Sequence, residues 1–188
     1  MKDKIFTIFA GVNGAGKSTL YRAKKQSNED FGVRINSDEI VRSFGDWRNS
    51  IDQMKAGKIA IQLRKECVDK GIDFNQETTL TGNRILKFID FIKEKGYKIH
   101  MFYVGLDSDE IAKKRIAERV KKGGHGIPDN VVEKRYIETL QNLKVVLPKV
   151  DQVEIYDNSI CYNLIAVKQD ENIKLYSKNL PKWFININ

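Results

Sequence analysis

A nine-residue run near the amino end of the chain, GVNGAGKST, has the residue types that bind phosphate. It matches the pattern G-x-x-x-x-G-K-[ST] at every fixed position. The glycines let main-chain N–H groups approach an anion closely, so that Lys17 would reach the β- and γ-phosphates and the Ser18 hydroxyl would bind Mg²⁺. We therefore expect the chain to bind a nucleoside triphosphate. The residues expected to contact it are Gly11, Val12, Asn13, Gly14, Ala15, Gly16, Lys17, Ser18 and Thr19.

Two carboxylates are candidates for deprotonating or binding a substrate that would accept a phosphoryl group. Asp38 follows one short predicted strand and Glu77 ends another, and ligands collect at such strand ends in parallel sheets. We expect Asp38 to be the base for an acceptor hydroxyl; its alternative role is helix capping together with Ser37. Glu77 and Thr79 would hold a polar substrate, or else form a hydrogen-bonded cluster at the strand end.

Basic residues further along the chain predict a lid. Arg115 and Arg119 lie four residues apart and so share one helix face, and a Gly-Gly break at 123–124 follows them. A hinged lid at about residues 108–130 would bring Arg119 to the transferring phosphoryl group as a catalytic residue. The alternative is a solvated basic face, which the neighbouring lysines would also suit.

Two more residues are substrate-binding candidates near this lid. His125 lies in the glycine-rich break, where it is either a contact to substrate phosphate or a surface residue. Arg135, on the helix that follows, would point toward the same region. No His/Cys cluster has metal-binding spacing. The phosphate-loop motif makes Ser18 the residue expected to contact a metal ion.

Alternating strand and helix patterns must position these side chains. The apolar runs and helical periodicities predict an α/β fold of three layers, a mostly parallel sheet with helices on both faces, to which the predicted helical lid belongs. The predicted strands cover residues 5–10, 33–36, 72–77, 97–104 and 153–157. The predicted helices cover residues 20–25, 40–44, 54–70, 83–95, 109–122 and 128–147.

Length and composition favour a single domain with a full hydrophobic core, since 188 residues with 41% hydrophobic and 31% charged residues are typical of globular proteins. We expect residues 1–160 to form the core, with the lid inside it. Residues 161–188 would form a β-hairpin-like tail of the same domain, turning at residues 169–172.

The charge and the apolar content restrict the partners. A formal charge of +8 suits acidic ligands such as nucleotides or nucleic acid, although lysines spread along the whole chain also occur without such a role. No apolar stretch approaches the roughly 18 residues that span a bilayer, and no signal peptide pattern is visible. Cys67 and Cys161 lie far apart without metal spacing. We expect a cytoplasmic protein with reduced thiols and no membrane partner.

Several blocks of sequence together resemble the zeta-toxin family, in particular its short bacterial members that are described as ATPases or kinases. The blocks occur in the family's order. They are residues 11–20, 35–40, 77–82, 104–108, 117–120, 123–128, 134–136 and 156–159. The resemblance implies a P-loop kinase fold that uses ATP and Mg²⁺. On matching positions it implies Lys17 for phosphate, Asp38 for the base, Glu77 and Thr79 for substrate contact, and Arg119 for the lid.

The function expected from the resemblance is transfer of the ATP γ-phosphate to a hydroxyl of a small, phosphorylated acceptor. Characterised zeta toxins phosphorylate a UDP-linked amino sugar, which makes nucleotide sugars the model acceptor and an antitoxin protein a candidate partner. Two alternatives stay open. One is a nucleic-acid 5′-hydroxyl kinase, which the basic charge would suit; the other is an ATP-binding or ATPase regulatory protein in which Asp38 and Glu77 are structural.

Overall fold

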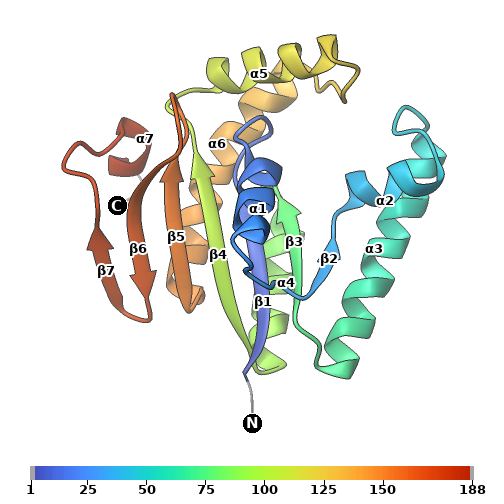
Figure 1. Ribbon diagram of the computed structural model, residues 1–188, viewed down its shortest axis with the longest axis horizontal. Helices are drawn as coiled ribbons and strands as arrows, with labels where there is room; N and C mark the ends of the chain where they lie inside the picture. The colour runs from blue at the N-terminus through green and yellow to red at the C-terminus, as the bar shows by residue number, and fades with distance from the viewer. Residues whose placement is uncertain (1–2, 187–188) are drawn as a thin grey trace.

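Seven strands form one sheet in the computed structural model, which describes residues 3–186 (Figure 1). Their order across the sheet is β2-β3-β1-β4-β5-β6-β7. The strands are β1 Lys4–Ala10, β2 Val33–Ile35, β3 Phe74–Thr78, β4 Tyr97–Gly105, β5 Gln152–Asp157, β6 Asn163–Gln169 and β7 Asn172–Leu175. The first five are parallel to one another, whereas β6 and β7 add an antiparallel edge. The sheet agrees with the predicted α/β class.

Helices cover both faces of the sheet. Figure 1 shows α1 on one face and α4 and α6 on the other, with α5 crossing the carboxyl ends of the strands and α2 and α3 beside β2. The helices are α1 Lys17–Gln26, α2 Ser37–Phe44, α3 Ser50–Lys70, α4 Asn83–Glu94, α5 Asp109–Lys121, α6 Asp129–Val146, the 3₁₀ helix η1 Leu147–Lys149, and α7 Lys182–Ile185. Within the described residues, no helix combines the length and apolarity needed to cross a membrane.

The central strand β1 is buried on both sides, as its nearly continuous apolar sequence requires. Phe6 and Ile8 face α4 and α6 in one core cluster, while Phe9 faces α1 in the other, because successive side chains of a strand alternate. In the second cluster Phe9 stacks on Phe102 with ring centroids 4.9 Å apart. Two packed layers therefore fix β1, and with it the loop that follows Ala10.

That loop approaches its neighbours so closely that side chains are excluded. Gly11 has a φ of 137°, and a Cβ there would collide with the carbonyl oxygen of Val104 in β4. Gly14 likewise lies against the backbone of Ala112 in α5. Glycine is required at both places because only it combines positive φ with so little volume.

The carboxy-terminal segment extends the sheet and then returns to its carboxyl end. β6 and β7 pair as a hairpin with Gln169 opposite Asn172, where the sequence predicts the turn. In α7, Trp183 is buried against Gly105, and its indole N–H donates to Asp157 at 2.9 Å. The segment thus packs against the end of β4 and the loop after β5.

The sequence predicted the wrong N-cap residue for α2. Asn36, and not Ser37, is the N-cap: its side-chain oxygen accepts a hydrogen bond from the Asp38 N–H at 3.0 Å. Ser37 is already the first helical residue. Both side chains suit a cap, and only the extended backbone at Asn36 distinguishes them.

Candidate functional site

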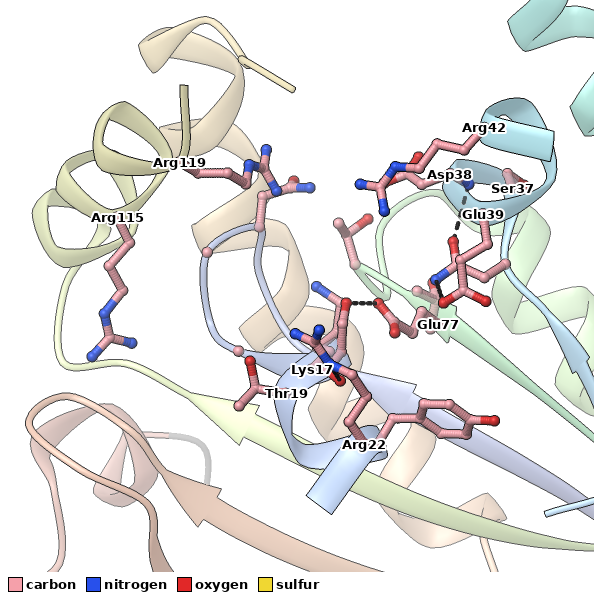
Figure 2. A pocket seen from close by; sticks show the side chains of 18 residues that line it. Lys17, Thr19, Arg22, Ser37, Asp38, Glu39, Arg42, Glu77, Arg115 and Arg119 are labelled. Carbon is pink, nitrogen blue, oxygen red and sulfur yellow. Dashed lines mark hydrogen bonds between the residues drawn. The ribbon is translucent and has the colours of Figure 1, made fainter. Parts of the chain in front are cut away.

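A cavity of about 540 Å³ opens at the carboxyl ends of β1, β2 and β3 (Figure 2). One wall is the phosphate loop, Gly11 to Thr19, with the start of α1. The opposite wall is α2, and α5 lies over the opening. The lining residues are Asn13, Gly14, Gly16, Lys17, Ser18, Thr19, Tyr21, Arg22, Asn36, Ser37, Asp38, Glu39, Arg42, Glu77, Thr78, Thr79, Arg115 and Arg119. Most of the predicted site residues thus meet in one place.

The phosphate loop is held by hydrogen bonds from the loop after β5. Asn158 donates to the carbonyl of Ala15 at 2.8 Å, and Tyr162 donates to the carbonyl of Gly16 at 2.6 Å. Gly16 begins α1 with a φ of 107°, and no side chain caps this helix. The helix N-terminus, with its partial positive charge, therefore stays available to an anion.

Lys17 is buried at the base of the loop. Its ammonium donates to the carbonyls of Gly11 at 2.9 Å and Val12 at 3.1 Å. Burial lowers the pKa of Lys17 to about 8, and the nearby carboxylates of Glu77 and Asp38 only partly offset this effect. A bound polyphosphate would add negative charge beside the ammonium and so favour its charged form.

Glu77 is engaged by two partners. Ser18 donates its hydroxyl hydrogen to Glu77 at 2.8 Å, and the guanidinium of Arg34 pairs with the other carboxylate oxygen. Arg34 also donates to Asn75 and Glu39 and stacks on the Tyr21 ring at 3.7 Å. Both Arg34 and Glu77 are largely buried, with side chains 13% and 12% exposed. Glu77 is therefore a fixed anion next to Ser18.

Asp38 is different because its carboxylate is unoccupied. Among the described residues, no group hydrogen-bonds to this carboxylate; only the Asp38 main-chain N–H is used, in the cap of α2. Figure 2 shows the side chain at the wall opposite the phosphate loop. Asp38 raises the pKa of Lys17, Arg119 and His125, so its charge acts within the cavity.

The two arginines of α5 have different positions. Arg115 is tied to the loop after β5, donating to the carbonyls of Asn158 at 2.7 Å and Ser159 at 3.3 Å. Arg119 extends toward the cavity, and its guanidinium donates to the main-chain carbonyl of His125. Its Nε is buried with no partner in the described residues. The spacing predicted that the two arginines share a helix face, but Arg115 holds the loop after β5 whereas Arg119 reaches the cavity.

His125 and Arg135 lie just outside the lining. The His125 ring contacts Trp47 of the α2–α3 loop edge to face, with centroids 4.5 Å apart. Burial lowers the pKa of His125, and the surrounding arginines lower it further against the opposing effect of Asp38. Arg135 donates to the side chain of Asn13 at 3.0 Å, so it supports the tip of the phosphate loop.

The donor atoms near Ser18 suit a magnesium ion. The Ser18 hydroxyl and the Glu77 carboxylate offer oxygen ligands side by side, and Mg²⁺ takes oxygen ligands, often only one or two from the protein beside phosphates and waters. In residues 3–186 no cluster of three or more His, Cys, Asp or Glu side chains could hold a metal by itself. The residues present therefore fit an ion held jointly by the protein and a nucleotide.

The sequence model that describes zeta toxins matches residues 2–180, nearly the whole chain. The chain belongs to the zeta toxin family. The match continues past residue 159, where the resembling blocks end, and includes both strands of the carboxy-terminal hairpin. An uncharacterised protein of Haemophilus influenzae is 36% identical over 130 residues, which make up 69% of this chain and 90% of that protein.

Solved structures with this fold include a two-protein complex and a toxin–antitoxin system. The AvrRxo1-ORF1:AvrRxo1-ORF2 complex with sulphate ions has a TM-score of 0.73 at 13% identity and covers 99% of this zeta-family chain. The same pair with ATP has a TM-score of 0.70 at 15% identity and covers 93%. This chain spans only 63% and 61% of the length of those two structures. The PezAT system of Streptococcus pneumoniae has a TM-score of 0.65 at 20% identity, covering 84% of this chain and 70% of that one.

Several residues of this zeta-family site escaped the sequence interpretation. Arg42 follows Asp38 by four residues, so helical spacing alone could have placed it on the same face. Arg34 and Tyr162 have no such signal, because their partners lie far away in sequence. Asn158 lies in the resembling block 156–159, but its hydrogen bond to Ala15 cannot be predicted from that block. Trp47 lies between the predicted helices 40–44 and 54–70, and only the tertiary structure brings it to His125.

Proposed function

We propose that this protein is an ATP-dependent phosphotransferase that transfers the γ-phosphate to a hydroxyl of a small acceptor. The family supports a P-loop kinase-like phosphotransferase. The observation that carries the proposal is the unoccupied Asp38 carboxylate, which faces the phosphate loop across one cavity. A base that is not engaged elsewhere is what proton removal from an acceptor hydroxyl requires.

In the proposed mechanism, each wall of the cavity has its own task. The amides of the phosphate loop and the Lys17 ammonium hold the β- and γ-phosphates. Asp38 accepts the proton of the acceptor hydroxyl while its oxygen attacks the γ-phosphorus and the bond to the β-phosphate oxygen breaks, releasing ADP. Arg119 stabilises negative charge on the phosphoryl group as it transfers.

Ser18 and Glu77 would hold Mg²⁺ together with the nucleotide phosphates. When bound, this ion would neutralise phosphate charge and orient the γ-phosphate. Arg34 keeps Glu77 in place. Tyr162 keeps the loop after β5 against the phosphate loop, and Arg115 ties the loop after β5 to α5. These residues act by positioning their neighbours.

The substrate contacts predicted from the sequence are part of the proposal. Thr79 lines the cavity, with its hydroxyl 2.7 Å from that of Thr81. Nucleotide sugars are the acceptor class that we propose first, and an antitoxin that covers the cavity is the proposed protein partner. Both AvrRxo1-ORF1 and the PezAT toxin come from systems with a partner protein, which supports the second suggestion.

The test is transfer of labelled phosphate from ATP to a metabolite extract, with the wild type compared with Asp38→Asn. We expect a labelled small product that the variant fails to form, at a rate lower by about 10²–10⁴-fold. Asp69→Asn, an exposed carboxylate of α3 outside the cavity, is the matched control and should retain activity.

Other results of this transfer experiment would favour one of the two alternative functions. Transfer to oligonucleotide 5′ ends instead of small acceptors would identify a nucleic-acid kinase. Nucleotide binding without turnover in the wild type would leave a regulatory ATP-binding protein, with Asp38 in a structural role. Equal activity of wild type and Asp38→Asn would reject Asp38 as the base.

A further inference from the structure

A smaller pocket lies on the face of the sheet that carries α1, away from the phosphate loop. It has a volume of about 280 Å³ and is formed by β1, β4, β5 and the segment between α1 and β2. Its lining residues are Ile5, Thr7, Glu29, Asp30, Phe31, His100, Met101, Phe102, Gln152 and Glu154. None of these residues lines the cavity at the phosphate loop, so the pocket is a separate place on the molecule.

The pocket lies where α1 leaves the sheet uncovered. α1 has 10 residues and is about 15 Å long, whereas β4 has 9 residues and extends over about 30 Å. Figure 1 shows α1 over the carboxyl-terminal halves of β1 and β4, while the lower part of β1, β4 and β5 faces the viewer with no helix in front of it. Parallel sheets are usually covered on both faces and apolar throughout. An uncovered part of such a sheet is therefore unusual.

Three polar side chains form a row on this uncovered face. In the strand register, Thr7 of β1 lies beside His100 of β4, and His100 lies beside Gln152 of β5. Neighbouring strands are about 4.8 Å apart, so the three side chains are adjacent to one another on the same face. All three line the pocket. The row thus puts hydrogen-bonding groups where a covered parallel sheet would have aliphatic ones.

The side chains of this polar row have no hydrogen bond to any of the described residues. Thr7 is only 2% exposed, so its hydroxyl is largely removed from bulk water as well. Burial lowers the pKa of the His100 imidazole, against the opposing effect of Asp151 and two further carboxylates, so the ring is neutral at pH 7 and one of its nitrogens can accept a hydrogen bond. Because buried polar groups nearly always have partners, the polar row indicates an occupant of the pocket.

The charges around the pocket favour a cation. Among the described lining residues the charged ones are all acidic, although the whole chain has a formal charge of +8. Glu29 and Glu154 share one ammonium, that of Lys24, at 3.3 Å and 3.0 Å, which leaves this group with one negative charge. Asp30 is 85% exposed and pairs with Lys25 at the rim. A ligand with one positive charge would balance the group, whereas a phosphate would be repelled.

The apolar lining and the volume restrict the rest of the ligand. Phe31 and Phe102 contact each other edge to face, with ring centroids 5.7 Å apart, beside the polar row. Aromatic faces attract cations, and the Lys24 ammonium already lies 4.8 Å from the centroid of the Phe102 ring. Ligand pockets commonly measure about 300–1,000 Å³, so this pocket suits a molecule much smaller than a nucleotide.

We infer that this pocket is a second ligand site, which binds a small planar organic cation of the amidinium or guanidinium class. Such a cation carries several N–H donors in one plane, which matches a row of acceptors better than the single point of an ammonium does. Thr7, His100 and Gln152 accept its hydrogen bonds, and Glu154 faces its charge. The inference does not depend on the proposed phosphotransferase function, because the two sites share no residue.

The experiment uses benzamidine, benzamide and benzoate as probes, since they have the same shape but carry a positive charge, no charge and a negative charge. Each is titrated into the full chain, and the amide resonances are followed by NMR. We expect benzamidine to bind about tenfold more tightly than benzamide, and benzoate not to bind. The shifts should be concentrated at residues 5–7, 29–31 and 152–154, and not at residues 11–19 of the phosphate loop.

The first variant removes one hydroxyl from the polar row. Thr7→Val keeps the shape of the side chain and should weaken benzamidine about fivefold. Thr139→Val is the matched control, because Thr139 is also buried, at 1% exposure, but lies in α6 outside the pocket. Gln152→Leu changes the half-buried end of the row and should give a similar loss; it keeps the inference testable if Thr7→Val does not fold.

The second variant tests the charge. Glu154→Gln should reduce the preference for benzamidine over benzamide to less than about threefold, because the negative charge is lost while the shape is kept. Glu94→Gln, an exposed carboxylate of α4 outside the pocket, should keep the preference of the wild type.

Several results would overturn the inference. The site is rejected if benzamidine fails to bind the wild type, or if Thr7→Val and Gln152→Leu both bind it as the wild type does. Shifts centred on residues 11–19 would place the probe in the cavity at the phosphate loop and would also reject the site. Benzamide binding as tightly as benzamidine would overturn the assignment of a cation. A failure to bind ATP would count against the proposed function and not against this site.

Discussion

The two walls of the cavity are built in opposite ways. The phosphate loop is braced from three directions, by Asn158, Tyr162 and Arg135, through hydrogen bonds of 2.6 to 3.0 Å. On the other wall, Asp38 and Arg42 have side chains without hydrogen bonds in the described structure.

This difference has a physical reason in the two ligands. A polyphosphate presents the same charged oxygens in every nucleotide, so a rigid loop of amides can be organised before it arrives. Groups that must exchange protons or select an acceptor need to remain unpaired until that acceptor binds, since a paired carboxylate or guanidinium would have to be freed first. The braced wall thus suits nucleotide binding, and the open wall suits chemistry and selection.

Among the changes that compare the two walls with their surroundings, the first concerns the braced wall and should have a large effect. Lys17→Ala should lower turnover by about a thousandfold, because removal of one preorganised charge from a phosphoryl-transfer site costs roughly 3–4 kcal/mol of transition-state stabilisation. The measurement is the steady-state rate with labelled ATP, together with circular dichroism to show that the fold is kept. Lys55→Ala, an exposed lysine of α3, should behave as wild type. Retained turnover in Lys17→Ala would defeat the assignment of the loop.

The ion pair beneath the cavity should affect stability more than any exposed pair. Arg34→Met leaves the buried Glu77 carboxylate without its partner and should lower the free energy of unfolding by about 3 kcal/mol, measured by urea denaturation. Arg48→Met removes the partner of Asp46 in a pair that is 69% and 56% exposed, and should cost less than about 1 kcal/mol. Similar losses in both variants would show that Arg34 does not stabilise Glu77.

A smaller effect should appear at the contact between Trp47, in the α2–α3 loop, and His125, which follows α5. Trp47→Leu removes the ring contact to His125, whose main-chain carbonyl holds Arg119, and should lower turnover about fivefold, or roughly 1 kcal/mol. Nucleotide affinity should stay the same, because the phosphate loop does not depend on this contact. Phe44→Leu is the control, an exposed aromatic residue at the end of α2 with no ring partner among the described residues. Weaker nucleotide binding by Trp47→Leu would remove the distinction between the walls.

The smallest expected effect is the uptake of a fraction of a proton when the nucleotide binds. The pKa of Lys17 is lowered to about 8 by burial, and bound phosphates should raise it again. Nucleotide binding at pH 8.5 should therefore take up as much as roughly three quarters of a proton, measured by calorimetry in buffers of different ionisation enthalpy. Lys17→Ala should abolish the uptake; uptake that persists in this variant would assign the proton to another group.

The same shift has a consequence for folding. Between about pH 8 and 10.5 the unfolded chain holds a proton on Lys17 that the folded chain has lost. The contribution of this group to stability therefore rises with pH across this window.

Local patterns were enough to predict the fold class and the phosphate loop. The strand–loop–helix order around residues 11–19 and the alternation of strands and helices are recorded in near neighbours along the chain, because main-chain geometry and amphipathic periodicity are local. The hairpin turn between Gln169 and Asn172 was found for the same reason.

Only the tertiary structure decided which polar residues are engaged and which are unpaired. Asp38 and Glu77 look alike in sequence, yet Glu77 is bound by Ser18 and Arg34 while Asp38 has no side-chain partner in the described residues. Asn158 and Tyr162 bond to a phosphate loop that lies more than seventy positions away in sequence. Arg42 and Arg119, which meet at the mouth of the cavity, are also more than seventy positions apart. Such pairings depend on how helices and strands pack together, and one sequence without its relatives carries no local pattern for them.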